Sequence, residues 1–191
     1  MHVRQTLAAD HARLTVVGDD RPGMLGVTSG VVASFGLSVC GAVAATWSGS
    51  GLAFQALTVE DTDRRALSQQ WWDEVAQCVR DELSGGMHAA VTWKPRGAVA
   101  VRTERLDLDH SLLTVEAADR VGLLWAISSH LRNCGINVRA AAVSHTAGRA
   151  ADTFLVDGYP EPDELRSHLL HGHCHHSAVP AGRMRRGGGD R

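Results

Sequence analysis

The 191-residue sequence is poor in several residue types, and each shortage excludes a class of protein. Its four cysteines are widely spaced without a CxxC pair, which argues against a disulfide scaffold and favours reduced, mostly buried thiols. Nineteen basic residues face 21 acidic ones, for a formal charge of −2, so no basic field predicts nucleic-acid binding. A P-loop, a GxSxG elbow and an HExxH motif are also absent. We therefore expect a non-enzyme without catalytic residues or a cofactor.

Charge is missing altogether between Pro22 and Val59, a stretch whose length would also suit a membrane hairpin. Glycine, serine and threonine interrupt it, and its second copy, described next, carries Arg132 and Arg139. We therefore expect a globular core element and no membrane contact. The N-terminal segment lacks the apolar run of a secretion signal, which predicts a cytoplasmic protein.

An internal repeat organises the chain. A shift of 99 residues aligns positions 7–49 with 106–148 and gives 15 identities in 43 positions. The identities include an Asp-Arg-x-Gly turn at 20–23 and 119–122, and a glycine at 36 and 135. The period is too long for a solenoid repeat of roughly 20–50 residues. The pattern predicts a domain duplication.

Each copy has the same expected order of elements. A β-rich run precedes the turn, an apolar helical pattern follows it, and two further strands come next. In the first copy, a helix over Ala66–Leu83 and a last strand at Ala89–Trp93 complete a βαββαβ unit. The sequence therefore predicts an α+β fold of two ferredoxin-like units with antiparallel sheets, the second lacking a clear last strand. The expected boundaries are an N-terminal arm (1–11), a first unit (12–95), a linker (96–110), an incomplete second unit (111–176) and a flexible tail (177–191).

These residues resemble a known family. A strand, then DRPGML or DRVGLL opening a helix, then GLSV or GINV opening a strand, looks like the ACT domain. The tandem, together with the segment RAADTFLVDG, is similar to the C-terminal ACT pair of the bacterial uridylyltransferases of nitrogen control. The resemblance implies units packed edge to edge in one continuous sheet. It also implies regulatory, allosteric binding of an amino acid between units.

The duplicated turn is the candidate ligand site. Free N–H groups at a helix N-terminus favour a carboxylate, the glycines allow close approach, and Asp20 and Asp119 can receive an ammonium group. The resemblance adds the residue that opens the second strand, Ser38 or Asn137. The candidate binding residues are Asp20, Arg21, Gly23, Met24, Leu25, Ser38, Asp119, Arg120, Gly122, Leu123, Leu124 and Asn137.

Simpler interpretations stay open for the same residues. The aspartates can cap helices, the glycines can serve geometry alone, the arginines can be solvated, and Asn137 can be a turn residue. The leading hypothesis is a regulatory protein that binds a small amino acid or related effector in amino-acid or nitrogen metabolism. The alternatives are a ligand-free interaction module that forms a homodimer or binds a partner protein through sheet edges, and a detached regulatory fragment of a uridylyltransferase-like enzyme.

Five histidines and one cysteine crowd between His168 and His176. Imidazole and thiolate suit zinc or copper, but no second ligand cluster stands at a conventional distance. We therefore expect no specific metal site.

Overall fold

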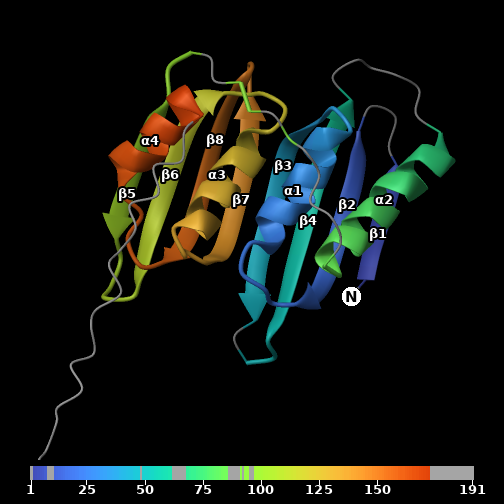
Figure 1. Ribbon diagram of the computed structural model, residues 1–191, viewed down its shortest axis with the longest axis horizontal. Coiled ribbons are helices and arrows are strands. Elements are labelled where there is room, and N and C mark those ends of the chain that lie inside the picture. Colours follow the sequence, from blue (N-terminus) through green and yellow to red (C-terminus); the bar gives the residue numbers. More distant parts are fainter. Residues whose placement is uncertain are drawn as a thin grey trace, which may run out of the picture.

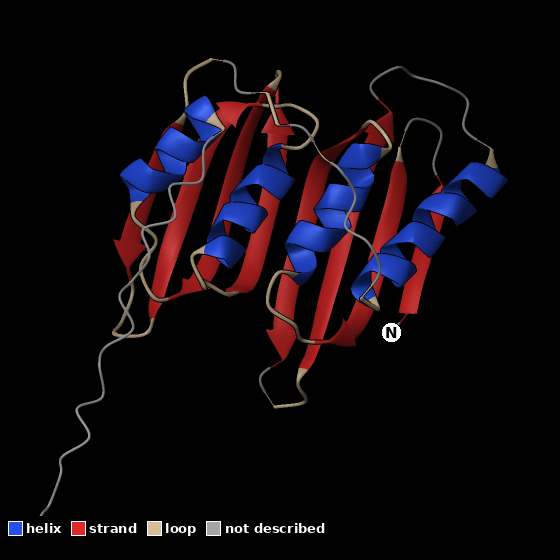
Figure 2. Ribbon diagram, in the orientation of Figure 1, coloured by secondary structure: helices blue, strands red, loops and turns tan. Residues whose placement is uncertain are grey.

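The structure is a computed structural model that describes residues 2–7, 11–47, 49–61, 68–85, 91, 93–94 and 97–172. Eight strands form one sheet, and four helices cover one of its faces (Figures 1 and 2). The first half contains β1 (His2–Leu7), β2 (Ala12–Asp19), α1 (Met24–Ser34), β3 (Leu37–Trp47), β4 (Leu52–Asp61) and α2 (Gln69–Leu83). The second half contains β5 (Ala100–Arg105), β6 (His110–Ala118), α3 (Leu123–Asn133), β7 (Val138–Thr146), β8 (Arg149–Asp157) and α4 (Pro162–His171).

The sheet has the order β1-β2-β4-β3-β7-β8-β6-β5, and its neighbouring strands are antiparallel. Each half contributes four strands and two helices. The prediction of an α+β fold made of two ferredoxin-like units with antiparallel sheets is confirmed.

The two units join through β3 and β7. Val43 pairs with Ala142, which is its own equivalent in the 99-residue repeat. Pairs on either side follow the same rule, because Ala42 faces Val143 while Ala44 faces Ala141. A pseudo-twofold axis therefore passes between β3 and β7. The two units pack edge to edge in one continuous sheet, as the resemblance implied.

The order of strands within each unit differs from the prediction. The fourth strand of each unit precedes the other three instead of ending the unit, so each unit runs ββαββα. Val91 and Trp93, the described residues of the expected last strand Ala89–Trp93, lie outside any strand. Trp93 instead donates from its indole Nε1 to the Leu169 carbonyl in α4, at 2.9 Å. The prediction of a last strand is therefore wrong at Val91 and Trp93, and the rest of the predicted strand lies outside the described residues.

The strands in question lie in the segments 1–11 and 96–110, which the sequence analysis assigned to an arm and a linker. β5 is a six-residue edge strand of sequence AVRTER, with exposed side chains on one face and little apolar character on the other. Such a strand has a weak alternation signal, because an edge strand buries little. β5 supplies the fourth strand of the second unit, so that unit is not missing a strand. The predicted flexible tail (177–191) lies outside the described residues.

Helix α1 explains the long uncharged run. It packs against α3 on one side, α2 on the other and the sheet beneath, and nine of its 11 residues are buried. Strands β3 and β4 follow it in the middle of the sheet. Such a helix has no face left for charge. None of the helices in the described part of the chain combines the length and apolar character needed to cross a membrane.

Candidate ligand sites between the two units

A pocket of about 30 Å³ lies where the first turn meets the second unit. It brings together five predicted residues of the first turn with Asn137, which comes from the other unit. Residues of β3 and β4 complete it from below. Among its lining residues are Asp20, Arg21, Gly23, Met24, Leu25, Gly26, Thr46, Gln55, Ser128, Arg132 and Asn137.

The turn leaves backbone donors open at the start of α1. Gly23 is the N-cap in a left-handed conformation (φ 84°), and no side chain caps the helix. Asp20 is therefore not the helix cap that the simpler interpretation allowed. The Met24 N–H bonds to the Arg21 carbonyl, and Val27 bonds back to Gly23. The N–H groups of Leu25 and Gly26, which line the pocket, have no partner within the helix.

Arg132 lies across Gly23. A Cβ at Gly23 would stand 2.3 Å from Arg132 Cδ and 2.9 Å from Nε, so only glycine admits this side chain. Arg132 comes from the last turn of α3, in the other unit. The contact places a guanidinium beside the open N–H groups of α1.

We expect Gly23→Ala to lower the free energy of unfolding by about 1–2 kcal/mol, because an L-residue is strained in the left-handed region. Gly122→Ala is the matched control, since it has the same backbone strain (φ 90°) but ordinary contacts of 3.5 Å or more. Urea unfolding should give similar losses for both. The Arg132 Nε–H resonance should move only in Gly23→Ala, and an unmoved resonance would refute the contact.

Gln55 supplies a buried acceptor to the same pocket. Its side chain is 3% exposed, and its Oε1 has no hydrogen-bond partner among the described residues. A buried amide oxygen without a donor is costly, so the site suits a ligand that donates. Asp20 lies half-buried at the pocket's edge, and Asn137 faces it from β7's side.

Arg21 also lines the pocket, but its guanidinium is engaged elsewhere. Nη1 donates to the Leu83 carbonyl at the end of α2, at 3.0 Å. Nη2 lies 3.9 Å from Asp19. This arginine fixes α2 to the turn and leaves Arg132 as the guanidinium beside the α1 N-terminus.

A second, smaller pocket of about 10 Å³ occupies the pseudo-symmetric position. It contains the predicted residues of the second turn, and Gly122 caps α3 in the left-handed conformation without a side-chain cap. Asp119 is therefore not a helix cap either. Ser38 is buried but does not line this pocket, whereas its neighbours Leu37 and Val39 do. The lining residues are Ser29, Leu37, Val39, Asp119, Arg120, Gly122, Leu123, Leu124, Val143, Ala150 and Asp152.

The two pockets differ at equivalent positions. Val16 pairs with Gln55 in β4, and its repeat equivalent Val115 pairs with Asp152 in β8, so an amide in one pocket corresponds to a carboxylate in the other. The second unit provides Arg132 and Arg139 where the first unit has Ala33 and Cys40. The first pocket therefore combines Asp20 with Arg21 and Arg132, whereas the second combines Asp119 and the buried Asp152 with the exposed Arg120.

The acids of the second pocket perturb each other. Burial, with a further contribution from the Asp119 charge, raises the pKa of Asp152 to about 7. Burial and the Glu60 charge raise the pKa of Asp119, while His145, whose Nδ1 lies 3.3 Å from Asp119 Oδ2, opposes this rise. Such a carboxylate cluster favours protonation or a cation.

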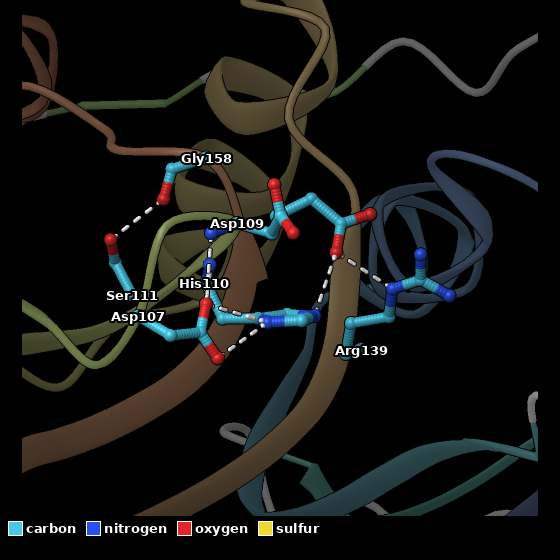
Figure 3. Close-up of polar contacts among 7 residues, drawn as sticks. Asp107, Asp109, His110, Ser111, Arg139 and Gly158 are labelled. Carbon is cyan, nitrogen blue, oxygen red and sulfur yellow. Dashed lines mark hydrogen bonds and ion pairs between the residues drawn. The ribbon is translucent and has the colours of Figure 1, made fainter.

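A polar network stands at the start of β6, beside the β5–β6 turn (Figure 3). His110 Nδ1 lies 3.0 Å from Asp107, its Nε2 lies 3.8 Å from Asp157, and Arg139 Nε donates to Asp157 at 2.7 Å. The backbone N–H of Asp109, followed by the His110 side chain, lowers the pKa of Asp107. The hydrogen bond to Asp157 raises the pKa of Arg139, and the Asp20 charge adds to it.

This network does not form a nucleophile–base pair. The neighbouring Ser111 hydroxyl is buried and donates to the Gly158 carbonyl at 2.6 Å rather than to His110. Asp107 instead accepts from the N–H groups of Asp109 and His110 and shapes the turn between β5 and β6. The network holds the Arg139 guanidinium against Asp157.

The start of the histidine-rich segment is part of the packing. His168 is buried in α4, with its ring 4.9 Å from that of His130 in α3. Burial, and then the His168 charge, lowers the pKa of His130 to about 4. The described residues include no group of three or more candidate metal ligands, and residues 173–176 lie outside them.

The fold and the pockets define a class of protein: a tandem of ferredoxin-like units with two small polar pockets between them.

No protein-family model matches the chain. Its sequence is similar to bifunctional uridylyltransferase/uridylyl-removing enzymes, with 26% identity to those of Rhodospirillum rubrum (161 residues) and Ralstonia nicotianae (179 residues). The matches cover 76% and 82% of this chain but 17% and 21% of the relatives. The resemblance to uridylyltransferases is confirmed, and the chain spans about a fifth of the length of these relatives.

Two solved structures also match. One is aspartate kinase from Synechocystis, with a TM-score of 0.47, 14% identity, and coverage of 78% of this chain and 24% of that chain. The other is the regulatory subunit of aspartate kinase from Thermus thermophilus, with a TM-score of 0.32, 15% identity, and coverage of 88% and 93%.

Sequence reasoning missed three residues of the sites: Arg132, Gln55 and Asp152. A signal for them existed in the repeat itself. Arg132 aligns with Ala33 without a gap, so the two copies differ in charge at this position. Gln55 and Asp152 were hidden because the turn before β8 is two residues shorter than the one before β4, which shifts the alignment.

Proposed function

We propose that the protein is a non-catalytic regulatory pair of ACT-type units that binds a small amino acid in the first pocket. The observation that carries this proposal is the buried Gln55 Oε1, an acceptor for which the described residues provide no donor, in a pocket shared by both units. The confirmed similarity to uridylyltransferases supports a regulatory role in nitrogen metabolism.

The pocket offers a partner to each end of a zwitterion. The ammonium group would lie between Asp20 and the Gln55 oxygen, since both accept hydrogen bonds. The carboxylate would meet the Leu25 and Gly26 N–H groups at the helix N-terminus, with Arg132 beside them. Asn137 can donate or accept at the entrance.

Binding would change how the two units meet. A volume of about 30 Å³ holds on the order of two water molecules, so an amino acid requires the Arg132 side chain to move from Gly23. Arg132 belongs to α3 and Gly23 to the turn before α1. A ligand that prefers the moved arrangement shifts the packing between units, which a partner protein can detect. Pairing with a second copy or a partner protein through sheet edges stays a prediction from the sequence.

A thermal-shift panel of the twenty common amino acids tests the proposal. We expect one or a few to stabilise the protein by about 2–3 kcal/mol at a concentration a hundredfold above Kd. Asp20→Asn and Arg132→Gln should each weaken binding tenfold or more, since each removes a charge-assisted hydrogen bond.

Arg166→Gln is the control for loss of a positive charge, because Arg166 lies on α4 and pairs only at the surface with Asp163. This variant should bind as the wild type does. Stabilisation by none of the twenty amino acids would contradict the proposal.

A further inference from the structure

The second pocket contains a buried acid that the proposed function does not use. Asp152 is 1% exposed, lines the pocket, and has no hydrogen-bond partner for its Oδ1 among the described residues. The carboxylate of Asp152 does accept a hydrogen bond from the backbone of Ser144. A buried carboxylate is normally paired with a cation or hydrogen-bonded throughout, so this oxygen marks a place for a donor.

The groups that the structure describes around Asp152 do not supply that donor. Asp119, which follows β6, carries the same sign as Asp152, and Glu60 of β4 adds its negative charge beside Asp119. His145 of β7 turns its Nδ1 toward Asp119, at 3.3 Å. Arg120 lines the pocket but is exposed to solvent at its mouth.

The pseudo-symmetric comparison sharpens the contrast. The first pocket receives Arg132 from α3 and has Arg139 near Asp20, whereas the second has Ala33 and Cys40 in those positions. Cys40 donates from Sγ to the Thr58 carbonyl, at 3.3 Å. The second pocket thus lacks both of these guanidinium groups, and it has the Asp152 carboxylate where the first pocket has the Gln55 amide.

We propose that the second pocket binds a primary ammonium group, held by the carboxylates of Asp119 and Asp152. Its volume of about 10 Å³ is on the order of a single water molecule, which suits a compact –NH₃⁺ head. The three N–H donors of an ammonium match several carboxylate oxygens. An anionic group would meet two like charges there. This site stands independently of the amino acid proposed for the first pocket.

The raised pKa of Asp152 gives the test a direct readout. An ammonium group binds the ionised carboxylate, so binding must lower the pKa of Asp152 from its value of about 7. The experiment follows the Asp152 side-chain ¹³C resonance of the full chain against pH, in methylammonium chloride and, at matched ionic strength, in tetramethylammonium chloride. Phosphate buffer is needed, because Tris is itself a primary amine.

We expect methylammonium to lower the pKa of Asp152 by about one pH unit, which corresponds to tenfold tighter binding by the ionised form. Tetramethylammonium, which has no N–H donor, should leave the titration unchanged. In Asp152→Asn and in Asp119→Asn, methylammonium binding followed at the backbone resonances of the second turn should weaken tenfold or more. Asp163→Asn, which removes an exposed carboxylate on α4 outside both pockets, should bind methylammonium as the wild type does.

A parallel titration with ammonium chloride shows whether the bound ammonium group is a free ammonium ion or part of a larger amine. Binding of both salts indicates that free ammonium is sufficient, and binding of methylammonium alone indicates an amine-bearing molecule. Identical titration curves in the methylammonium and tetramethylammonium salts would overturn the proposal. Equal binding of magnesium chloride would also overturn it, in favour of a metal site. Because this titration is followed at Asp152 and the second turn, whereas the amino-acid proposal is tested with variants of the first pocket, failure here is distinguishable from failure of the amino-acid proposal.

Discussion

At pH 8, Asp152→Asn should be more stable than the wild-type protein, with an expected gain on the order of 2–4 kcal/mol. The folded-state pKa of Asp152 is about 7, against a reference value of 3.8. Each pH unit of this difference corresponds to about 1.36 kcal/mol, which sets an upper bound of about 4 kcal/mol. The asparagine amide needs its own partners, which reduces the gain.

The sign of the effect depends on pH. Below about pH 4, Asp152 is protonated in both the folded and the unfolded state, so its ionisation contributes nothing. Between about pH 4 and pH 7 the unfolded chain loses this proton and the folded chain retains it, so wild-type stability falls as pH rises. Above pH 7 the penalty is constant. The stability difference between Asp152→Asn and wild type should follow this curve.

Urea unfolding between pH 4 and pH 8 measures the difference directly. Asp163→Asn is the control for a general charge effect, because Asp163 is exposed on α4. This control should show no comparable rise in relative stability. If the stability difference between Asp152→Asn and wild type were the same at every pH, Asp152 would not be the buried acid described.

Gly30→Leu is the second change with a large expected effect, since it enters the contact between the two units. Helices α1 and α3 pack closely there, and a Cβ at Gly30 would already lie 2.8 Å from Trp125 Cδ1. A leucine adds four carbons to a closed interface. We expect a loss of roughly 3 kcal/mol or more in the free energy of unfolding, the upper end of overpacking effects.

The same helix provides the matched control. A Cβ at Gly26 would meet Ser128 Cβ at 3.5 Å, an ordinary contact. Gly26→Ala should therefore be neutral or stabilising by about 0.5–1 kcal/mol, through helix propensity alone. Combining Gly30→Leu with Trp125→Ala should recover part of the lost stability in a double-mutant cycle. Full additivity of the two changes would show that α1 and α3 do not meet at this point.

Much of the fold could be predicted because both copies of the repeat carry the same pattern of apolar residues and turns. The two turns, the helices after them and the central strands each carry a strong apolar pattern, and the 99-residue shift doubles every signal. The place of the fourth strand could not be predicted in the same way. β5 is a short edge strand with polar side chains, and its neighbour β6 follows after a tight turn shaped by Asp107. Local pattern therefore favoured Ala89–Trp93, whose Trp93 contacts α4 instead.

The candidate sites were predicted in outline. The turns and Asn137 do line inter-unit pockets, because a pseudo-twofold axis between β3 and β7 brings each turn to the start of the other unit's strand. The charge difference between the pockets could not be predicted. This difference depends on the contact of Arg132 with Gly23 of the other unit and on the strand register that makes Gln55 and Asp152 equivalent. Both are features of the tertiary structure.

An NMR titration of the full chain with the amino acid that gives the largest thermal shift tests the central claim most directly. The account predicts saturable changes at the backbone N–H groups of Leu25 and Gly26, at the Asn137 and Gln55 side-chain amides, and at Arg132 Nε–H, all with one dissociation constant. If these resonances did not shift, or if only resonances elsewhere on the chain shifted, the result would contradict an effector site between the two units.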